Sequence, residues 1–250
     1  MKKSMITWGC VLLFAGHALA QDAPSMFAVY QDNVMPSKDA QFNDGVKKLK
    51  AAVEQNKIDF KWTTYGFDDG SYAHVVPISN FAQLDKNPFA PLETKIGKEA
   101  LAGLWSTIDQ CIESQSTSII VRMPEYSYLS STAEDAFRDI TYWYVLPDKE
   151  AEAGKLFAEW KQLHETKKDG QGYSVYKGVF GNERGGYLII SWGKTILDWA
   201  TKRQKSNEIL GDDATKLWTK TMAISRKYYS KKAWLQKDLS NNPPAPMATK

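Results

Sequence analysis

The sequence has few of the residues that usually build metal and nucleophilic sites. Its 250 residues include two cysteines and three histidines. Structural zinc sites generally take four Cys or His ligands, and no G-x-S-x-G, H-E-x-x-H or Walker pattern occurs in the chain. We therefore expect no metal site and no bound cofactor.

The first twenty residues have the pattern of a signal peptide. Met-Lys-Lys is followed by the apolar run MITWGCVLLFAGH, which is too short for a membrane span, and then by ALA at residues 18–20. This order predicts cleavage before Gln21 and a periplasmic or secreted protein. The alternative is a buried N-terminal helix.

Cleavage would make the chain poorer still in reactive groups. Cys10 and His17 would be lost, leaving Cys111, His74 and His164. A single cysteine cannot form an internal disulfide, so the fold must depend on core burial. Loss of Lys2 and Lys3 would lower the net charge from +3 to +1. That charge does not favour a nucleic-acid partner, and no later apolar run is long enough for a transmembrane segment.

One set of landmarks occurs twice. EALAGLWSTIDQCIES, which contains Trp105, resembles DATKLWTKTMAISRKYYS, which contains Trp218. NVMPSK is likewise matched by YVLPDK, and each is followed by an amphipathic helix pattern. FKWTTYGFDDGSYAHVVPIS is matched by YSVYKGVFGNERGGYLIISW, each with a glycine turn between two β-rich runs. The common order favours a duplicated domain.

Each copy is predicted to contain a strand, a helix, two strands, a second helix and a final strand. This βαββαβ order is that of a ferredoxin-like domain. We expect repeats at residues 21–135 and 136–240, with final strands at TSIIVRMPEY and KKAWLQKDL. The proline-rich residues 241–250 are expected to form a flexible tail.

The expected strands are apolar on nearly both faces. MFAVY, YWYVL and GYLIISW do not alternate between apolar and polar residues, as strands with one face in water do. The face away from the helices must therefore be covered. We predict an α+β protein in which the two repeats pack sheet to sheet as an intrachain pseudo-dimeric α/β barrel.

This arrangement resembles the dimeric α/β-barrel superfamily, which includes NIPSNAP-like and antibiotic-biosynthesis-monooxygenase-like proteins. The resemblance covers nearly all of residues 25–240 and depends on element order and duplication. It implies two kinds of site. Haem-binding members use a histidine as iron ligand, and some cofactor-free monooxygenase-like members place aromatic, Asn and His residues around an apolar cavity.

The candidate ligand-binding residues are His74, Trp62 and Tyr72. His74 and Tyr72 lie two residues apart in an expected strand and so share one face. The alternative is a hydrogen-bonded structural histidine. His164 ends an apolar helix stripe, where a cation would suit the helix dipole. Cys111, Trp105 and Trp218 are expected in the core, the two tryptophans as equivalent buried anchors.

Two classes of function follow. The first is an exported, non-catalytic binding or structural module with a small apolar ligand in a cavity. The second is a cofactor-independent monooxygenase-like or haem-binding enzyme. The scarcity of histidine and of clustered acids favours the first. A cavity lined by His74, Trp62 and tyrosines with polar atoms pointing inward would favour the second.

Overall fold

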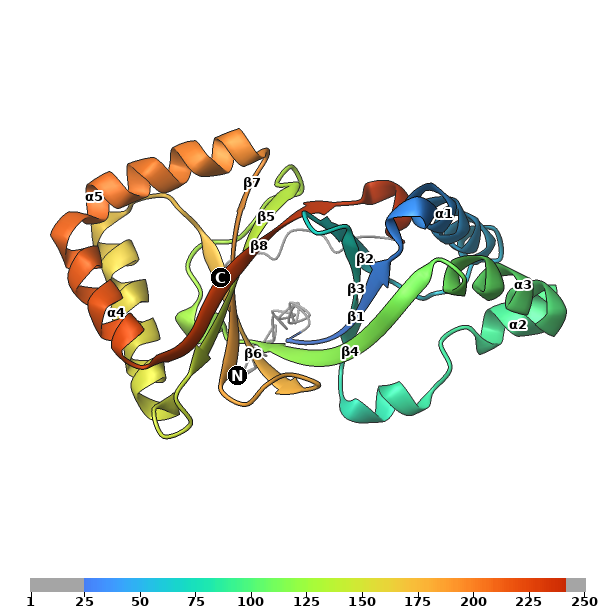
Figure 1. Ribbon diagram of the computed structural model, residues 1–250, viewed down its shortest axis with the longest axis horizontal. Helices are drawn as coiled ribbons and strands as arrows, with labels where there is room; N and C mark the ends of the chain where they lie inside the picture. Colours follow the sequence, from blue (N-terminus) through green and yellow to red (C-terminus); the bar gives the residue numbers. More distant parts are fainter. Residues whose placement is uncertain (1–24, 242–250) are drawn as a thin grey trace, which may run out of the picture.

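The computed structural model describes residues 25–241, in which eight antiparallel strands close into one barrel (Figure 1). The first half contains β1 (Met26–Val34), α1 (Asp39–Gln55), β2 (Thr63–Phe67), β3 (Ser71–Ile78), α2 (Ala90–Ile96), α3 (Lys98–Asp109) and β4 (Ile112–Arg122). The second contains β5 (Phe137–Val145), α4 (Glu150–Lys167), β6 (Tyr173–Phe180), β7 (Gly186–Gly193), α5 (Ile196–Ala223) and β8 (Ser225–Leu235). Short 3₁₀ turns include η2 (Phe81–Asp85) and η4 (Lys237–Leu239).

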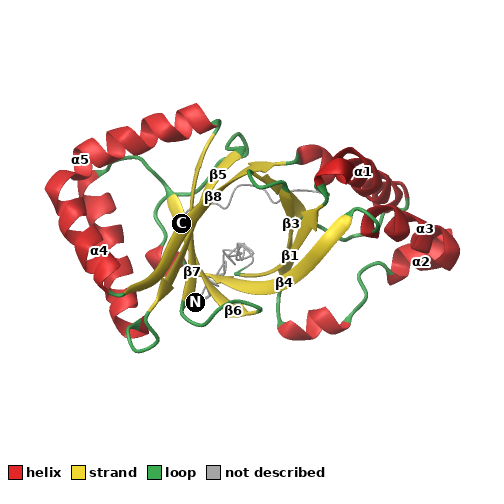
Figure 2. Cartoon of the chain, viewed as in Figure 1, coloured by secondary structure: helices red, strands yellow, loops and turns green. Residues whose placement is uncertain are grey.

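The barrel order is β1-β3-β2-β8-β5-β7-β6-β4, so each half contributes a ferredoxin-like sheet. The halves join where β4 pairs with β6 and β2 pairs with β8. The helices lie outside, at opposite ends of the molecule (Figure 2). The structure confirms the predicted tandem ferredoxin-like fold with an intrachain α/β barrel.

Each sheet is buried on two faces, for different reasons. On β1, Ala28 and Val34 pack with the helices of the first half, whereas Phe27 packs with Ile120 and Tyr176 inside the barrel. Successive strand residues point to opposite faces. One face of each sheet is therefore apolar because helices cover it, and the other face is apolar because it lines the barrel interior. The sequence indicated that both faces are covered.

The last strand of each half begins earlier than predicted. β4 starts at Ile112 and β8 at Ser225. The polar stretches ESQSTS and RKYYSKK have no apolar alternation, which is the pattern on which the prediction depended. They form strands because their backbones pair with β1 and β5 along almost the full length of those strands.

Helix α5 consists of two helical segments joined at a kink. It bends at Gly211, whose φ of 53° lies in the left-handed region that glycine adopts without steric cost. The Leu-Trp segment follows this bend. Its Leu217 is buried, but Trp218 is 41% exposed and packs edge-on against Tyr228 of β8. The prediction that Trp105 and Trp218 are equivalent buried anchors is therefore wrong for Trp218.

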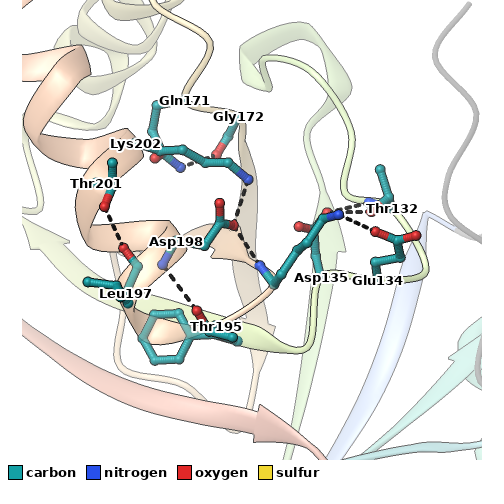
Figure 3. A network of polar contacts seen from close by, with 12 residues as sticks. Thr132, Glu134, Asp135, Gln171, Gly172, Thr195, Leu197, Asp198, Thr201 and Lys202 are labelled. Atoms are coloured by element: carbon teal, nitrogen blue, oxygen red, sulfur yellow. Dashed lines mark hydrogen bonds and ion pairs between the residues drawn. The ribbon is translucent and has the colours of Figure 1, made fainter.

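The connection between the halves is fixed by polar contacts near the start of α5 (Figure 3). Asp135 accepts hydrogen bonds from the amide and hydroxyl of Thr132, at 2.6 and 3.0 Å. Glu134 forms an ion pair with Lys194. At the N-terminus of α5, the Thr195 hydroxyl accepts a hydrogen bond from the Asp198 amide. The ion pair between Glu134 and Lys194 attaches the linker to the second half.

Two further observations concern the predicted flanking segments. Within residues 25–241, no helix has the length and apolar content needed to cross a membrane. The predicted signal peptide, residues 1–20, lies outside the described residues. Of the predicted tail, 241–250, only Asn241 is described, and it is buried.

Candidate functional site

A cavity of about 370 Å³ lies in the first half, between the outer face of the sheet and the helices. Its walls come from β1, β3 and β4, from α1 and α3, and from the segments that precede β2 and α2. The lining residues are Tyr30, Asp32, Val46, Leu49, Phe60, Trp62, His74, Val76, Pro88, Phe89, Trp105, Ile108, Asp109 and Gln115. Asp32 and Trp62 are buried, whereas Asp109 and Gln115 are exposed. The cavity thus reaches solvent on the side of Asp109 and Gln115.

Aromatic rings form a continuous part of the wall. The Phe60 ring lies 5.6 Å from that of Trp62 and 5.0 Å from that of Phe89, centroid to centroid. Phe89 in turn meets Trp105 edge-on at 5.0 Å. Pro88 and Phe89 belong to the segment between η2 and α2, and the first helical segment of α5, before Gly211, occupies the matching place in the second half. The segment before α2 therefore supplies part of the wall.

A chain of hydrogen bonds lies on the opposite, sheet-side wall. Asp32 of β1 accepts a hydrogen bond from the Gln115 side chain at 2.6 Å, and its other oxygen lies 3.3 Å from Nε2 of His74. Nδ1 of His74 lies 2.9 Å from the Thr64 hydroxyl. Strand register explains this grouping, because His74 pairs with Thr64 on β2 and Asp32 pairs with Gln115 on β4.

The Thr64 hydroxyl determines which nitrogen of His74 carries a fixed proton. Its single hydrogen is donated to the carbonyl oxygen of Leu239 at 3.0 Å. It must then accept from His74, which requires a proton on Nδ1. Nε2 is the ring nitrogen that faces Asp32.

Residues 239–241, which follow β8 of the second half, form hydrogen bonds with residues of this site. The Leu239 carbonyl also accepts a hydrogen bond from Nε1 of Trp62 at 2.7 Å. The Ser240 hydroxyl accepts from the Thr64 amide at 2.9 Å, and the Asn241 side chain donates to the Phe60 carbonyl at 2.5 Å. These bonds attach Ser240 and Asn241 to the first half, although Asn241 was predicted to belong to the tail.

Asp109, at the end of α3, is the second carboxyl group of the cavity. Partial burial raises the pKa of Asp109, and the negative charge of Asp32 raises it further. The two carboxyl groups therefore influence one another across the cavity.

The structure brings two of the three predicted site residues together. His74 and Trp62 line the cavity. Tyr72 is not among the lining residues. Its hydroxyl donates to Asp39 at 2.7 Å and accepts from Asn43 at 2.9 Å, which ties β3 to α1. Burial and the Asp39 carboxylate raise the pKa of Tyr72 to about 12.

Sequence reasoning missed Asp32, Asp109, Gln115 and Thr64. Asp32 carried a readable signal, because period two places it on the same face of β1 as Ala28 and Tyr30. A carboxylate on the helix-covered face of a strand is unusual and indicates a polar partner or a site. Asp109 and Gln115 carried no such signal, because polar residues are ordinary at a helix end and on an exposed strand.

The cavity does not fit a haem group. Both ring nitrogens of His74 already contact polar partners, Thr64 and Asp32, so neither is free for iron. Among the described residues that line the cavity there is no Lys or Arg to pair with haem propionates. Residues 25–241 also contain no group of three or more His, Cys, Asp and Glu placed to hold a metal ion.

The remaining histidine, His164, is in the second half and is buried. Its Nδ1 lies 2.9 Å from Asp169, which also accepts a hydrogen bond from Ser206. Burial lowers the pKa of His164, although Asp169 opposes this effect. His164 lies in the last turn of α4, as expected, but it belongs to a buried polar network, and its lowered pKa disfavours the cationic form. Cys111 is also fully buried, as expected.

No protein-family model matches the chain, and no curated protein matches it in sequence. Solved structures match its fold. An anthrone oxidase-like protein matches with a TM-score of 0.55 and 14% identity, covering 86% of this chain and 92% of its own. A proposed monooxygenase from Lactobacillus acidophilus NCFM has a TM-score of 0.55 and 9% identity, with 85% and 94% covered. A chlorite dismutase variant from Candidatus Nitrospira defluvii has a TM-score of 0.53 and 10% identity, with 86% and 94% covered. Identities this low show the fold alone, and that fold is the one shared by the dimeric α/β-barrel superfamily.

Proposed function

We propose that the protein binds a small, largely apolar or aromatic molecule in the cavity of its first half. The observation that supports this proposal is the cavity itself. Its volume of about 370 Å³ falls within the range of about 300–1,000 Å³ typical of small-molecule sites. Aromatic walls with a few converging polar groups are also typical of such sites.

The second half supports the proposal, because it has the same topology without this arrangement. The buried positions of α1 and α4 correspond, so that Val46 and Leu49 of the cavity wall are matched by Phe157 and Trp160. The Phe157 ring packs against Trp143 at 5.1 Å, within the core of that half. Small side chains at Val46 and Leu49 are therefore not a requirement of the fold.

Binding can be tested by isothermal titration calorimetry with 1-naphthalenemethanol, an aromatic probe of suitable size. The double substitution Val46→Phe, Leu49→Trp would place the side chains of the second half in the cavity. We expect it to abolish binding while the protein remains folded, as judged by circular dichroism and melting temperature. Trp218→Phe, on the exposed side of α5, serves as the control and should bind like the unaltered protein. Equal binding by the cavity-filled variant would contradict the proposal.

A second candidate is catalysis on the bound molecule, and one observation favours it. The Nε2 atom of His74 faces Asp32 at the cavity wall, and such a pair can accept a proton from an acidic methylene group. The fold likeness to an anthrone oxidase-like protein suggests oxidation of anthrone by dioxygen as the reaction to test, in which the methylene group becomes a carbonyl and water is released. Oxygen uptake with anthrone tests this candidate. His74→Gln should abolish uptake while 1-naphthalenemethanol still binds, and an unchanged rate would exclude His74 as the base.

Export is part of the proposal. The signal-peptide pattern in residues 1–20 supports a periplasmic or secreted protein whose mature chain begins at Gln21. Mass spectrometry of the protein from its source cells measures the N-terminus directly. An intact Met1 in the mature protein would contradict cleavage.

A further inference from the structure

Carboxyl groups outnumber basic groups around the cavity. Asp32 and Asp109 each contribute a carboxyl group, and His74 contributes the one basic group among the lining residues described, with no Lys or Arg. The whole chain has slightly more basic than acidic residues, with 32 Lys and Arg against 29 Asp and Glu. The cavity therefore differs in charge from the chain as a whole.

This polar cluster is not required by the fold. Strand register matches Asp32, which pairs with Tyr72, to Trp143, which pairs with Tyr187. It likewise matches His74 to Ile189 of β7, and Thr64 to Val175 of β6. The same places in the second half are thus filled by apolar side chains.

Asp32 is buried, with 3% of its surface exposed, yet it contacts no Lys or Arg. Its neighbours are Gln115, which donates one hydrogen bond, and Nε2 of His74. Burial of a carboxylate is costly unless a cation or several donors compensate for lost water. The negative charge of Asp32 also reaches Asp109, where it raises the pKa. A cation in the cavity would lower the energy of both carboxylates.

The rest of the wall is suited to the same kind of ligand. Tyr30, Phe60, Trp62, Phe89 and Trp105 present aromatic side chains to the cavity. The faces of aromatic rings attract cations, most strongly for tryptophan, and the attraction grows when water is excluded. An anionic ligand would instead be repelled by the carboxylates and would find no basic partner except His74.

We propose that the ligand of this cavity is an organic cation, in which an ammonium group is attached to an aromatic or apolar body. The ammonium group lies on the side of Asp32 and Asp109, and the body packs among the aromatic rings. This inference depends on the proposed function, because it names the chemical class of molecule that the cavity binds.

Three probes of nearly equal size separate charge from shape. 1-Naphthylmethylamine is cationic at pH 7, 1-naphthalenemethanol is neutral and 1-naphthoate is anionic. We expect calorimetry to give an affinity for the amine at least about tenfold higher than for the alcohol, and no measurable binding of naphthoate. Alcohol binding equal to or tighter than amine binding would overturn the charge assignment and leave the proposed binding function intact. Failure of all three probes to bind would contradict the binding function itself.

Two substitutions test the role of the carboxylates. Asp109→Asn, at an exposed position, and Asp32→Asn should each reduce the preference for the amine over the alcohol. Asp109→Asn keeps the test decisive if the buried Asp32→Asn substitution unfolds the protein. Asp44→Asn, on the exposed face of α1, is the matched control and should preserve the preference. A full preference for the amine in the Asp109→Asn and Asp32→Asn variants would overturn the inference.

Discussion

In the first half, Val46 and Leu49 leave a cavity between the sheet and the helices; in the second half, Phe157 and Trp160 stand at the matching positions. In the second half aromatic rings pack edge-on, with Phe157 5.1 Å from both Trp143 and Tyr187. The first half has a chain of hydrogen-bonded polar side chains at places where the second half has apolar side chains. The comparison indicates that one copy of the duplicated domain contributes mainly stability and the other has space for a ligand.

The largest effect is expected when the two halves are separated. We expect fragments 21–134 and 135–250, expressed alone, to be poorly soluble, because each would expose the sheet face that now lines the barrel and the unpaired edges of β2 and β4 or of β6 and β8. Mixing the fragments should restore a folded complex, measured by size-exclusion chromatography and circular dichroism. Two stable, monomeric fragments would show that neither half needs the other.

Matched truncations on α1 and α4 should reveal the difference in packing. Phe157→Ala should lower the free energy of unfolding by about 3–5 kcal/mol, because it removes a buried ring from close contact with Trp143 and Tyr187. Val46→Ala should cost about 1–2 kcal/mol, since fewer atoms are lost and the side chain already borders a cavity. Urea denaturation of both variants measures the two costs. Equal costs would mean that the halves are packed alike.

The buried His164 should make stability depend on pH, and this contribution has no match in the first half, because Val53 stands at the corresponding place in α1. Burial lowers the pKa of His164 from its ordinary 6.5, and Arg203 adds to this while Asp169 opposes it. The unfolded chain therefore takes up a proton before the folded protein does. Stability should be highest above pH 6.5 and fall below it, by at most about 1.4 kcal/mol per pH unit.

Thermal unfolding between pH 5 and 8 checks the contribution of His164. The variant His164→Gln should show a flatter dependence than the unaltered protein over this range. The same slope in both proteins would show that His164 is protonated equally in the folded and unfolded states.

The smallest effect is expected at the repeated Leu-Trp segment. Trp218→Ala should change stability by about 0.5 kcal/mol or less, because the ring is 41% exposed and contacts mainly Tyr228. Trp105→Ala should cost more and should also weaken 1-naphthalenemethanol binding, because Trp105 lines the cavity. Calorimetry and melting curves of both variants test this. Similar losses of stability in the two variants would support the sequence-based prediction that Trp105 and Trp218 are equivalent buried residues.

Much of the fold could be predicted because it depends on patterns that repeat along the chain. The doubled order of strands and helices, and apolar runs such as YWYVL, indicated a covered tandem sheet. The starts of β4 and β8 were missed because their residues are polar, and pairing with β1 and β5, which sequence periodicity does not record, makes them strands.

The site was predicted in part. His74 and Trp62 were found because histidine is scarce and tryptophan is large. Asp32 and Asp109 were missed because a strand and a helix that are distant in the sequence bring them to one cavity only in the folded chain. The burial of Trp218 was predicted wrongly because a repeated sequence implies the same order of strands and helices, whereas the burial of a residue depends on the side chains around it.

The hydrogen bonds from residues 239–241 to Trp62 and Thr64 have a consequence for the order of synthesis. Domains generally fold in the order in which they leave the ribosome, with the N-terminal one first. Here the cavity belongs to the first half, but Leu239, the acceptor that fixes the proton on His74, is among the last residues described. During translation the cavity walls would be made early, and the site would be completed only after the whole second half had emerged.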